Sequence, residues 1–416
     1  MKTLIDLFAG CGGLSLGLEK AGFTPIYVIE LHPDAMQTYL ANRLHLPVAK
    51  SNNQSNDITK VTRSKNDLKA LATRLSKSYG DIDLVAGGPP CQGFSGIGHR
   101  RSFEVTKKQM PNNHLYREMA KFIAEVGPKV FIFENVRGLL NSKWTPEGIK
   151  GEIWTDVLKT FHDIKIKKGT KNYTYNIYWE LVFAKDFGVP QNRPRIIMIG
   201  IRSDINVLTA IEIKNIFQRQ KFQTSAPNPI ELLGDLIDPK WVSGGSTMIY
   251  PSAPKNKVQE MLRYNPITKN VSKKGDPLTD HDYAKHSLHV LKKFKYMIEH
   301  DGKITPSMQT KKFAQRLIPE YWGEKGPFIT ATSLPDDYVH FSQPRVLSVR
   351  EWARLQTFPD WYQFHGKRTT GGRRRAGDPS LGVWTRDLPK YTQIGNAVPV
   401  DLAMEIGKII LNILND

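Results

Sequence analysis

Short β-rich runs alternate with helical stretches through the first two hundred residues of this chain, and no other feature constrains its fold as strongly. The runs typical of strands are residues 3–8, 25–30, 82–86, 130–134, 178–183 and 195–201. The stretches typical of helices are residues 14–21, 33–42, 67–78 and 115–126. Such alternation predicts an α/β fold, with a mixed, mostly parallel sheet and helices on both of its faces.

The alternation fades near residue 205, where Pro, Gly, Ser and Lys become common. We therefore expect a first domain over residues 1–204 and a smaller, irregular second domain over residues 205–364. Residues 365–390 are rich in Gly and Arg, as a hinge or loop is. Residues 400–414 have the pattern of an amphipathic helix that docks back on the first domain. Residues 164–178 give no clear strand or helix pattern and fit a hairpin.

Length and cysteine count exclude several classes of protein. With 416 residues, 40% of them hydrophobic, the chain can bury a large core, unlike a disulfide- or metal-dependent mini-protein. Cys11 and Cys91 are too few for a disulfide framework or a tetrahedral cysteine zinc site. No apolar run approaches the ~20 residues of a membrane span, and the first residues are too acidic for a signal peptide. We therefore expect a cytosolic monomer without a bound metal or a membrane partner.

The chain is strongly basic, with 59 Lys and Arg residues against 40 Asp and Glu residues and a formal net charge of +19. Such a charge suits a polyanionic partner such as nucleic acid, although solubility alone is the alternative. Residues 255–312 hold 13 basic against 6 acidic residues, which a Lys-rich solvated face explains equally well. Residues 364–390 hold 7 against 2, including Arg373, Arg374 and Arg375, which we expect to touch phosphates or to join domains.

A predicted strand, a glycine-rich turn and a helix follow one another at residues 6–14 (DLFAGCGGL). This order lets the backbone approach a ligand at a helix N-terminus. The next strand ends in Glu30, where a carboxylate can accept from a ribose diol. The dinucleotide fingerprint would need glycine at Ser15, and the triphosphate-binding pattern is absent from this turn. The turn therefore favours S-adenosylmethionine, which carries adenosine without phosphates.

One aromatic and one acidic side chain complete the predicted binding site for S-adenosylmethionine. Phe8 would stack on the ligand, and Asp57 would accept from the adenine amino group. A short polar turn is an equally good account of Asp57.

A stiff turn, GGPPCQGFS, follows the predicted strand at 82–86 and carries Cys91. A single cysteine is most often a small buried side chain. Two glycines and two prolines at the carboxyl end of a strand instead place Cys91 at the edge where open α/β sheets bind ligands. The next predicted strand ends in Glu134, for which a solvated strand end is the alternative. If the two strands are neighbours, the thiol and the carboxyl open onto one cleft, as addition to a pyrimidine ring requires.

Arg193 and Arg195 precede the last predicted strand of the first domain. With this spacing they project to the same face of an extended backbone, so both can reach the cleft and hold a base carbonyl or a phosphate. Ordinary surface arginines are the alternative.

Six ordered blocks of the sequence resemble the motifs of the DNA cytosine-5 methyltransferase family. They cover nearly the whole chain, at residues 6–13 (DLFAGCGG), 87–95 (GGPPCQGFS), 134–136 (ENV), 191–195 (QNRPR), 348–360 (SVREWARLQTFPD) and 393–399 (QIGNAVP). The resemblance implies a Rossmann-like S-adenosylmethionine-dependent methyltransferase fold and a cytosine flipped out of duplex DNA as substrate. Residues 391–416 would then complete the first domain, and residues 205–364 would be the target-recognition domain.

The resemblance also assigns roles to individual residues. Cys91 would attack C6 of the cytosine, Glu134 would contact N3 and the exocyclic amine, and Arg193 and Arg195 would hold the flipped base and a nearby phosphate. The cofactor-binding positions would be Phe8, Gly10, Gly12, Gly13, Glu30, Asp57, Pro89 and Asn396. The DNA contacts would be Gln92, Ser95, Arg100, Arg101, Arg373, Arg374 and Arg375. Cys11 occupies a variable position and receives no catalytic role.

The sequence therefore predicts a sequence-specific DNA methyltransferase of a restriction–modification system, with double-stranded DNA as partner and a companion endonuclease on another chain. An RNA cytosine-5 methyltransferase that acts on tRNA is one alternative, and the large basic insertion favours DNA over it. A non-catalytic DNA-binding module is another, against which the presence of thiol, carboxyl and both arginines argues.

Overall fold

The computed structural model describes residues 1–90, 111–205, 213–214, 217–218, 225–309, 315–332, 335–370 and 387–415. Several residues with predicted roles lie outside these ranges, namely Cys91, Gln92, Ser95, Arg100, Arg101, Arg373, Arg374 and Arg375.

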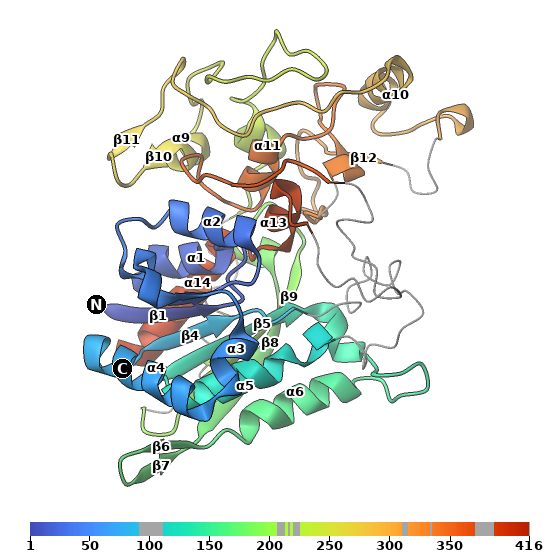
Figure 1. Cartoon of the computed structure of the whole chain (residues 1–416). Coiled ribbons are helices and arrows are strands. Elements are labelled where there is room, and N and C mark those ends of the chain that lie inside the picture. The colour runs from blue at the N-terminus through green and yellow to red at the C-terminus, as the bar shows by residue number, and fades with distance from the viewer. Residues whose placement is uncertain are drawn as a thin grey trace.

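A seven-stranded sheet lies at the centre of the first half of the chain (Figure 1). Its order is β3-β2-β1-β4-β5-β9-β8. The strands are β1 (Lys2–Leu7), β2 (Phe23–Ile29), β3 (Gln54–Ser55), β4 (Leu84–Gly87), β5 (Val130–Val136), β8 (Tyr175–Phe183) and β9 (Pro194–Arg202). Strands β1 to β5 run parallel to one another, whereas β9 is antiparallel to both β5 and β8. The predicted α/β fold with a mixed, mostly parallel sheet is confirmed.

Helices cover both faces of the sheet because successive residues of its strands are apolar on both sides. Ile5, Val85 and Phe131 pack with helices α3 to α6 on one face, whereas Leu4 and Val130 pack with α1 and α14 on the other. The helices are α1 (Gly13–Ala21), α2 (Pro33–Ala41), α3 (Ile58–Arg63), α4 (Lys65–Tyr79), α5 (Leu115–Val126), α6 (Glu152–His162) and α14 (Val400–Asn415). No helix in the described ranges is long and apolar enough to cross a membrane.

The C-terminal helix α14 lies against α1, although their sequences are separated by almost the whole chain (Figure 1). Glycine permits this close approach, since a Cβ atom at Gly17 would lie 2.3 Å from the Val400 carbonyl oxygen. The amphipathic pattern at residues 400–414 thus predicted both the helix and its docking.

Two features of the first half differ from the predicted elements. Helix α6 was not predicted, although Ile153, Trp154, Val157 and Phe161 form a buried face with helical spacing. Residues 164–178 do contain a hairpin, formed by β6 (Ile166–Lys168) and β7 (Lys171–Tyr173). Strand β8 follows at once and begins at Tyr175, earlier than the predicted position 178.

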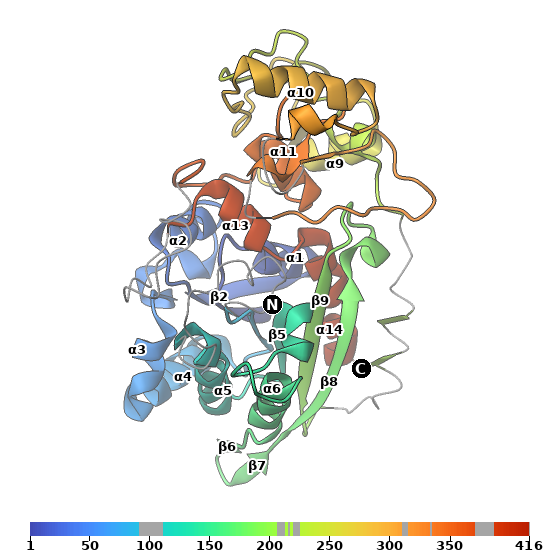
Figure 2. The ribbon, with the colours of Figure 1, turned by 90° about the vertical axis from the view of Figure 1, so that its right-hand side faces the viewer.

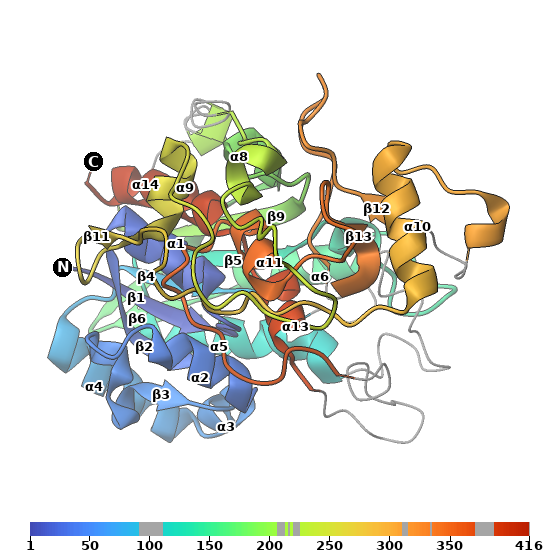
Figure 3. The same ribbon diagram turned by 90° about the horizontal axis from the view of Figure 1, so that it is seen from above.

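The second half of the chain forms a less regular layer, which lies above α1 and α2 (Figures 1 and 2). Its helices are α8 (Pro229–Leu233), α9 (Lys257–Arg263), α10 (Leu288–Glu299), α11 (Val349–Leu355) and α13 (Lys390–Asn396). Its strands pair as β10 (Tyr264–Asn265) with β11 (Asn270–Val271), and β12 (Arg316–Leu317) with β13 (Tyr338–Val339). Helix α10 projects to the side where β5 ends (Figures 1 and 3). Trp352 and Tyr362 share one core with Cys11 and Leu16, so the two layers are packed together.

Candidate active site

Backbone geometry shapes the turn between β1 and α1. Phe8, Gly10 and Gly12 have positive φ angles of 60°, 56° and 84°. Glycine adopts such angles readily, whereas Phe8 is a strained exception of the kind that gathers at functional sites. A Cβ atom at Gly10 would meet nothing within 4 Å, but one at Gly13 would lie 2.4 Å from the Val398 carbonyl oxygen. The turn is therefore open at Gly10 and closed by packing at Gly13.

Glu30 lies beside the open part of this turn, directly after β2. Its Oε2 accepts a hydrogen bond from the Gly10 N–H at 2.7 Å, and its Oε1 accepts from the His32 N–H at 2.8 Å. Burial raises the pKa of Glu30, and these backbone hydrogen bonds oppose the rise. Each oxygen has a further lone pair, so the carboxylate can also accept from two ribose hydroxyls. The free space at Gly10 and this fixed carboxylate fit the adenosyl group of S-adenosylmethionine.

The other predicted cofactor positions have local structural roles. Asp57 is the N-cap of α3, and its Oδ1 accepts from the Thr59 N–H at 2.9 Å, so the alternative account of this residue holds and its adenine contact stays a prediction. Pro89 is buried, and its carbonyl accepts from Asn135 Nδ2 at 3.1 Å. Asn396 is exposed at the end of α13, and the residues that follow it abut Gly13.

Glu134 ends the apolar part of β5, and β5 is the direct neighbour of β4. Its Oε1 lies 2.6 Å from Nε of Arg195, and both side chains are largely buried. Burial raises the pKa of Glu134, while the positive charges of Arg195 and Arg193 lower it in part. A Cβ atom at Gly88 would lie 2.8 Å from Glu134 Oε2. The carboxyl group is therefore held between Arg195 and the backbone of the turn that leads to Cys91.

Arg193 and Arg195 have different partners, although the sequence predicted that both reach the cleft. Arg193 is buried, and its Nη1 and Nη2 donate to the carbonyls of Ala331 and Gly395 at 2.7 and 2.6 Å. Its Nε has no hydrogen-bond partner among the described residues. Arg193 thus connects the first half of the chain to two segments of the second, those of Ala331 and of α13, whereas Arg195 contacts the carboxyl group at the strand end.

Cys11 is a buried thiol within the glycine turn, and its Sγ donates to the Gln393 carbonyl at 3.4 Å. Burial raises the pKa of this thiol to about 12, so it stays protonated and a poor nucleophile near neutral pH. Cys11 is therefore not expected to act as a nucleophile.

Sequence reasoning missed two polar groups behind the glycine turn. Arg43 and Tyr362 are both fully buried, and they hydrogen-bond to each other and to carbonyls of the turn. Arg43 lies just after the end of α2, where an arginine is expected at the surface, so no sequence signal predicted its burial.

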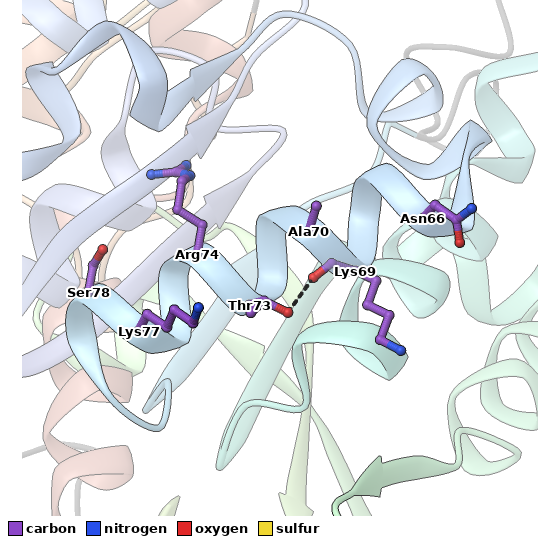
Figure 4. A pocket seen from close by; sticks show the side chains of 7 residues that line it. All are labelled: Asn66, Lys69, Ala70, Thr73, Arg74, Lys77 and Ser78. Carbon is purple, nitrogen blue, oxygen red and sulfur yellow. Dashed lines mark hydrogen bonds between the residues drawn. The ribbon is translucent and has the colours of Figure 1, made fainter.

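A surface depression along α4 lies apart from these groups (Figure 4). It is lined by Asn66, Lys69, Ala70, Thr73, Arg74, Lys77 and Ser78. This lining has no thiol or carboxyl group, and none of the predicted site residues belongs to it. In the part of the chain that the structure describes, no group of three or more His, Cys, Asp or Glu side chains is placed to hold a metal ion.

Sequence comparisons agree with this geometry. Residues 2–412 match the family model of the C-5 cytosine-specific DNA methylases. The chain is 32% identical to the type II methyltransferase M.DdeI of Desulfomicrobium norvegicum, with 100% of this chain and 91% of the relative aligned. It is also 32% identical to the type II methyltransferase M.PspPI of Psychrobacter sp., with 99% and 80% aligned.

Solved structures give the same result for the fold. A candidate DNA modification methyltransferase encoded within an E. coli prophage superposes with a TM-score of 0.68 at 22% identity, over 100% of both chains. The S. pombe Dnmt2 methyltransferase superposes with a TM-score of 0.53 at 14% identity, over 100% of this chain and 99% of that one. With its family motifs in order from end to end, this chain belongs to the C-5 cytosine-specific DNA methylases and is a DNA (cytosine-5)-methyltransferase.

Proposed function

We propose that this enzyme methylates C5 of a cytosine within a specific sequence of duplex DNA, after the cytosine has been flipped out and bonded to Cys91. The pairing of β4 with β5 carries the proposal. Strand β4 leads into the turn that bears Cys91, and β5 ends in Glu134, which Arg195 contacts. The proposal therefore assigns the thiol and the carboxyl to adjacent strand ends of one sheet, where open α/β folds bind their ligands.

The proposed chemistry uses the raised pKa of Glu134. The Cys91 thiolate forms a bond to C6, and the electrons of the C5–C6 double bond move toward N3. Glu134 shares its proton with N3 as this charge develops, so C5 becomes nucleophilic and forms the bond to the methyl group. The C5 proton then leaves to a base, N3 returns its proton to Glu134, the C6–S bond breaks, and the aromatic ring and the thiolate are restored. Arg195 orients the carboxyl group throughout.

S-adenosylmethionine would supply an electrophilic methyl group when it is bound, and its thioether, S-adenosylhomocysteine, would be the leaving group. Glu30 is proposed to accept from the ribose hydroxyls and Phe8 to stack on the adenosyl group. The remaining proposed contacts come from Gly10, Gly12, Gly13, Asp57, Pro89 and Asn396.

We assign DNA recognition to residues 205–364, with residues 365–390 as a hinge and residues 391–416 completing the catalytic domain of residues 1–204. Gln92, Ser95, Arg100, Arg101, Arg373, Arg374 and Arg375 are the proposed DNA contacts. Because M.DdeI and M.PspPI are named type II methyltransferases, we also propose a restriction–modification system and an endonuclease partner on another chain. Arg193 and Arg195 are proposed to hold the flipped base and a nearby phosphate, and each terminal nitrogen of Arg193 also donates to one backbone carbonyl.

Transfer of labelled methyl groups to duplex DNA tests the mechanism. Cys91→Ser should abolish transfer and should also prevent a covalent adduct with DNA that contains 5-fluorocytosine. Cys11→Ala is the matched control, since it removes the other thiol and should still form the adduct. Undiminished transfer by Cys91→Ser would contradict the mechanism.

The choice of acceptor tests the substrate. The wild-type enzyme should methylate duplex DNA and leave tRNA unmodified, and the reverse would favour the RNA enzyme. Bisulfite sequencing of DNA from a methylation-free host that expresses the protein should then reveal one recurring sequence around the modified cytosine.

A further inference from the structure

Arg43 is a fully buried guanidinium directly behind the cofactor turn. Its Nε donates to Glu19 Oε1 at 2.7 Å, and its Nη1 donates to the Tyr39 carbonyl and to the Tyr362 hydroxyl, both at 2.9 Å. Its Nη2 donates to the Gly12 carbonyl at 3.2 Å. The guanidinium also lies over the Tyr39 ring, 4.0 Å from the ring centroid. Its charge and its planar set of donors are thus satisfied in a single orientation.

Tyr362 contacts the same turn from the second half of the chain. Its hydroxyl accepts from Arg43 and donates to the Cys11 carbonyl at 2.6 Å. Packing is tight here, because a Cβ atom at Gly12 would lie 2.7 Å from that hydroxyl and 2.9 Å from Arg43 Nη1. Two successive carbonyls of the glycine turn are therefore bound by this pair.

The orientation of these carbonyls determines where the neighbouring N–H groups point. In a planar trans peptide, C=O and N–H point in opposite directions. The Gly12 carbonyl accepts from Arg43 and from the Leu16 N–H, so the Gly13 N–H points away from Arg43 and out of the helix N-terminus. The first N–H groups of a helix have no partner within the helix and are available to a ligand. Arg43 thus fixes the direction of the Gly13 N–H at the helix N-terminus. Tyr362 holds the preceding peptide, whose Gly12 N–H donates to the Ala9 carbonyl at 2.9 Å and closes the turn.

The segment that carries Tyr362 is anchored at both ends. Asn42 and Gln363 exchange two hydrogen bonds, each 2.9 Å long, which attach the segment to the end of α2. On its other side, Arg354 of α11 is bound to Asp360 and to Asp235, and Asp235 also binds Arg263 of α9. All four of these charged side chains are buried. A continuous set of polar contacts therefore connects the second half of the chain to the glycine turn.

From this geometry we propose that Arg43 and Tyr362 are positioning residues of the cofactor site, through which the second half of the chain sets the shape of the glycine turn. The inference rests on the proposed S-adenosylmethionine site. It extends that site to two residues with no expected contact to the cofactor.

Tyr362→Phe tests the inference, because it removes both hydroxyl hydrogen bonds and keeps the ring in the core. We expect the dissociation constant for S-adenosylmethionine, measured by calorimetry without DNA, to rise about tenfold, as the loss of two buried hydrogen bonds predicts. KM for S-adenosylmethionine should rise equally, while kcat at saturating cofactor should change less than threefold. Arg43→Lys should also weaken binding, since an ammonium lacks the planar set of donors.

Tyr175→Phe is the matched control. Tyr175 is equally buried and donates to a backbone carbonyl, that of Pro128 at 2.7 Å, but it lies in a separate core. Its variant should bind the cofactor as the wild type does and should show any general cost of a lost buried hydroxyl in its melting temperature. Wild-type affinity in a folded Tyr362→Phe variant would overturn the inference, as would an equal loss in both variants. Failure of the wild type to bind S-adenosylmethionine would instead overturn the proposed function.

Discussion

Glu134 shows how much one side chain with a proposed catalytic role depends on its immediate neighbours. Arg195 contacts one carboxylate oxygen at 2.6 Å, and Gly88 leaves room for the other. Burial is the largest influence on the pKa of this carboxyl and raises it, although two arginines oppose the shift. A carboxyl group transfers a proton to and from a ring nitrogen most efficiently when its pKa is near the working pH. The net rise moves the pKa of Glu134 in that direction.

Gly88→Ala is expected to impair catalysis with little effect on folding. The added methyl group would lie 2.8 Å from Glu134 Oε2, so the carboxyl must shift away from its contact with Arg195. Since misplacement of a catalytic group by about 1 Å can cost about a hundredfold in rate, we expect kcat to fall roughly 10- to 100-fold. Steady-state kinetics and thermal unfolding measure the two effects.

Gly323→Ala is the matched control for this variant, because a Cβ atom there meets nothing within 4 Å. It should keep wild-type kcat. Equal rates for Gly88→Ala and Gly323→Ala would show that the position of the Glu134 carboxyl is not limiting.

For single residues, the sequence predicted contacts between neighbouring strands and missed contacts between segments that are far apart in the chain. The end of β5 and the turn after β4 could be placed side by side from the parallel-sheet pattern, and the structure pairs these strands. The burial of Arg193 could not be predicted, because its two acceptors are 138 and 202 residues away. Arg43 and Tyr362 are separated by 319 residues and carry no local signal of their contact.

Among the elements, α11 shows how short helices are stabilised without regular secondary structure around them. The capping box of Ser348 and Glu351 fixes its first turn. Arg354 in its last turn binds Asp235 and Asp360, and Asp235 also binds Arg263 of α9. Asp235 therefore neutralises two buried guanidinium groups from two different helices.

Asp235→Asn should strongly destabilise the protein, because two buried arginines would lose a charged partner. Breaking a buried ion pair on one side typically costs about 3–5 kcal/mol. Unfolding in urea, followed by tryptophan fluorescence, should show a transition at lower denaturant concentration. Asp163→Asn is the control, since it breaks an exposed pair with Lys159 on α6 and should leave the transition unmoved. A wild-type midpoint for Asp235→Asn would mean that the network contributes nothing to stability.

Elements of the sheet were predicted well, and those of the second half were not. Long apolar runs and amphipathic stretches gave β1, β2, β4, β5 and β9 to within a few residues, and α5 with its observed bounds. Helices α8, α9 and α11 have five to seven residues each, too few to show a helical period. Strands of two residues, such as β12 and β13, give no alternation at all.

For the whole molecule, the structure changes how the net charge of +19 should be interpreted. Some arginines lie inside the protein with acidic or carbonyl partners and cannot meet a polyanion, namely Arg43, Arg202, Arg263, Arg345, Arg350 and Arg354. Lysines therefore supply much of the accessible charge. On α10, Lys292 and Lys295 are exposed, and this helix projects to the side where β5 ends (Figures 1 and 3). On α4, Lys69 and Lys77 are also exposed, but all three views place α4 far from α10.

The salt dependence of DNA binding can separate these two basic helices. If α10 contacts the backbone of DNA bound at the ends of the strands, Lys292→Ala should lower affinity at low salt. It should also reduce the slope of log K against log salt by about 1, since one phosphate contact is lost. Lys69→Ala removes the same charge from α4 and should leave the slope unchanged, because net charge alone does not determine the number of ions released. Equal slopes for the two variants would place the bound DNA away from α10, and a larger change for Lys69→Ala would move it to the opposite side of the molecule.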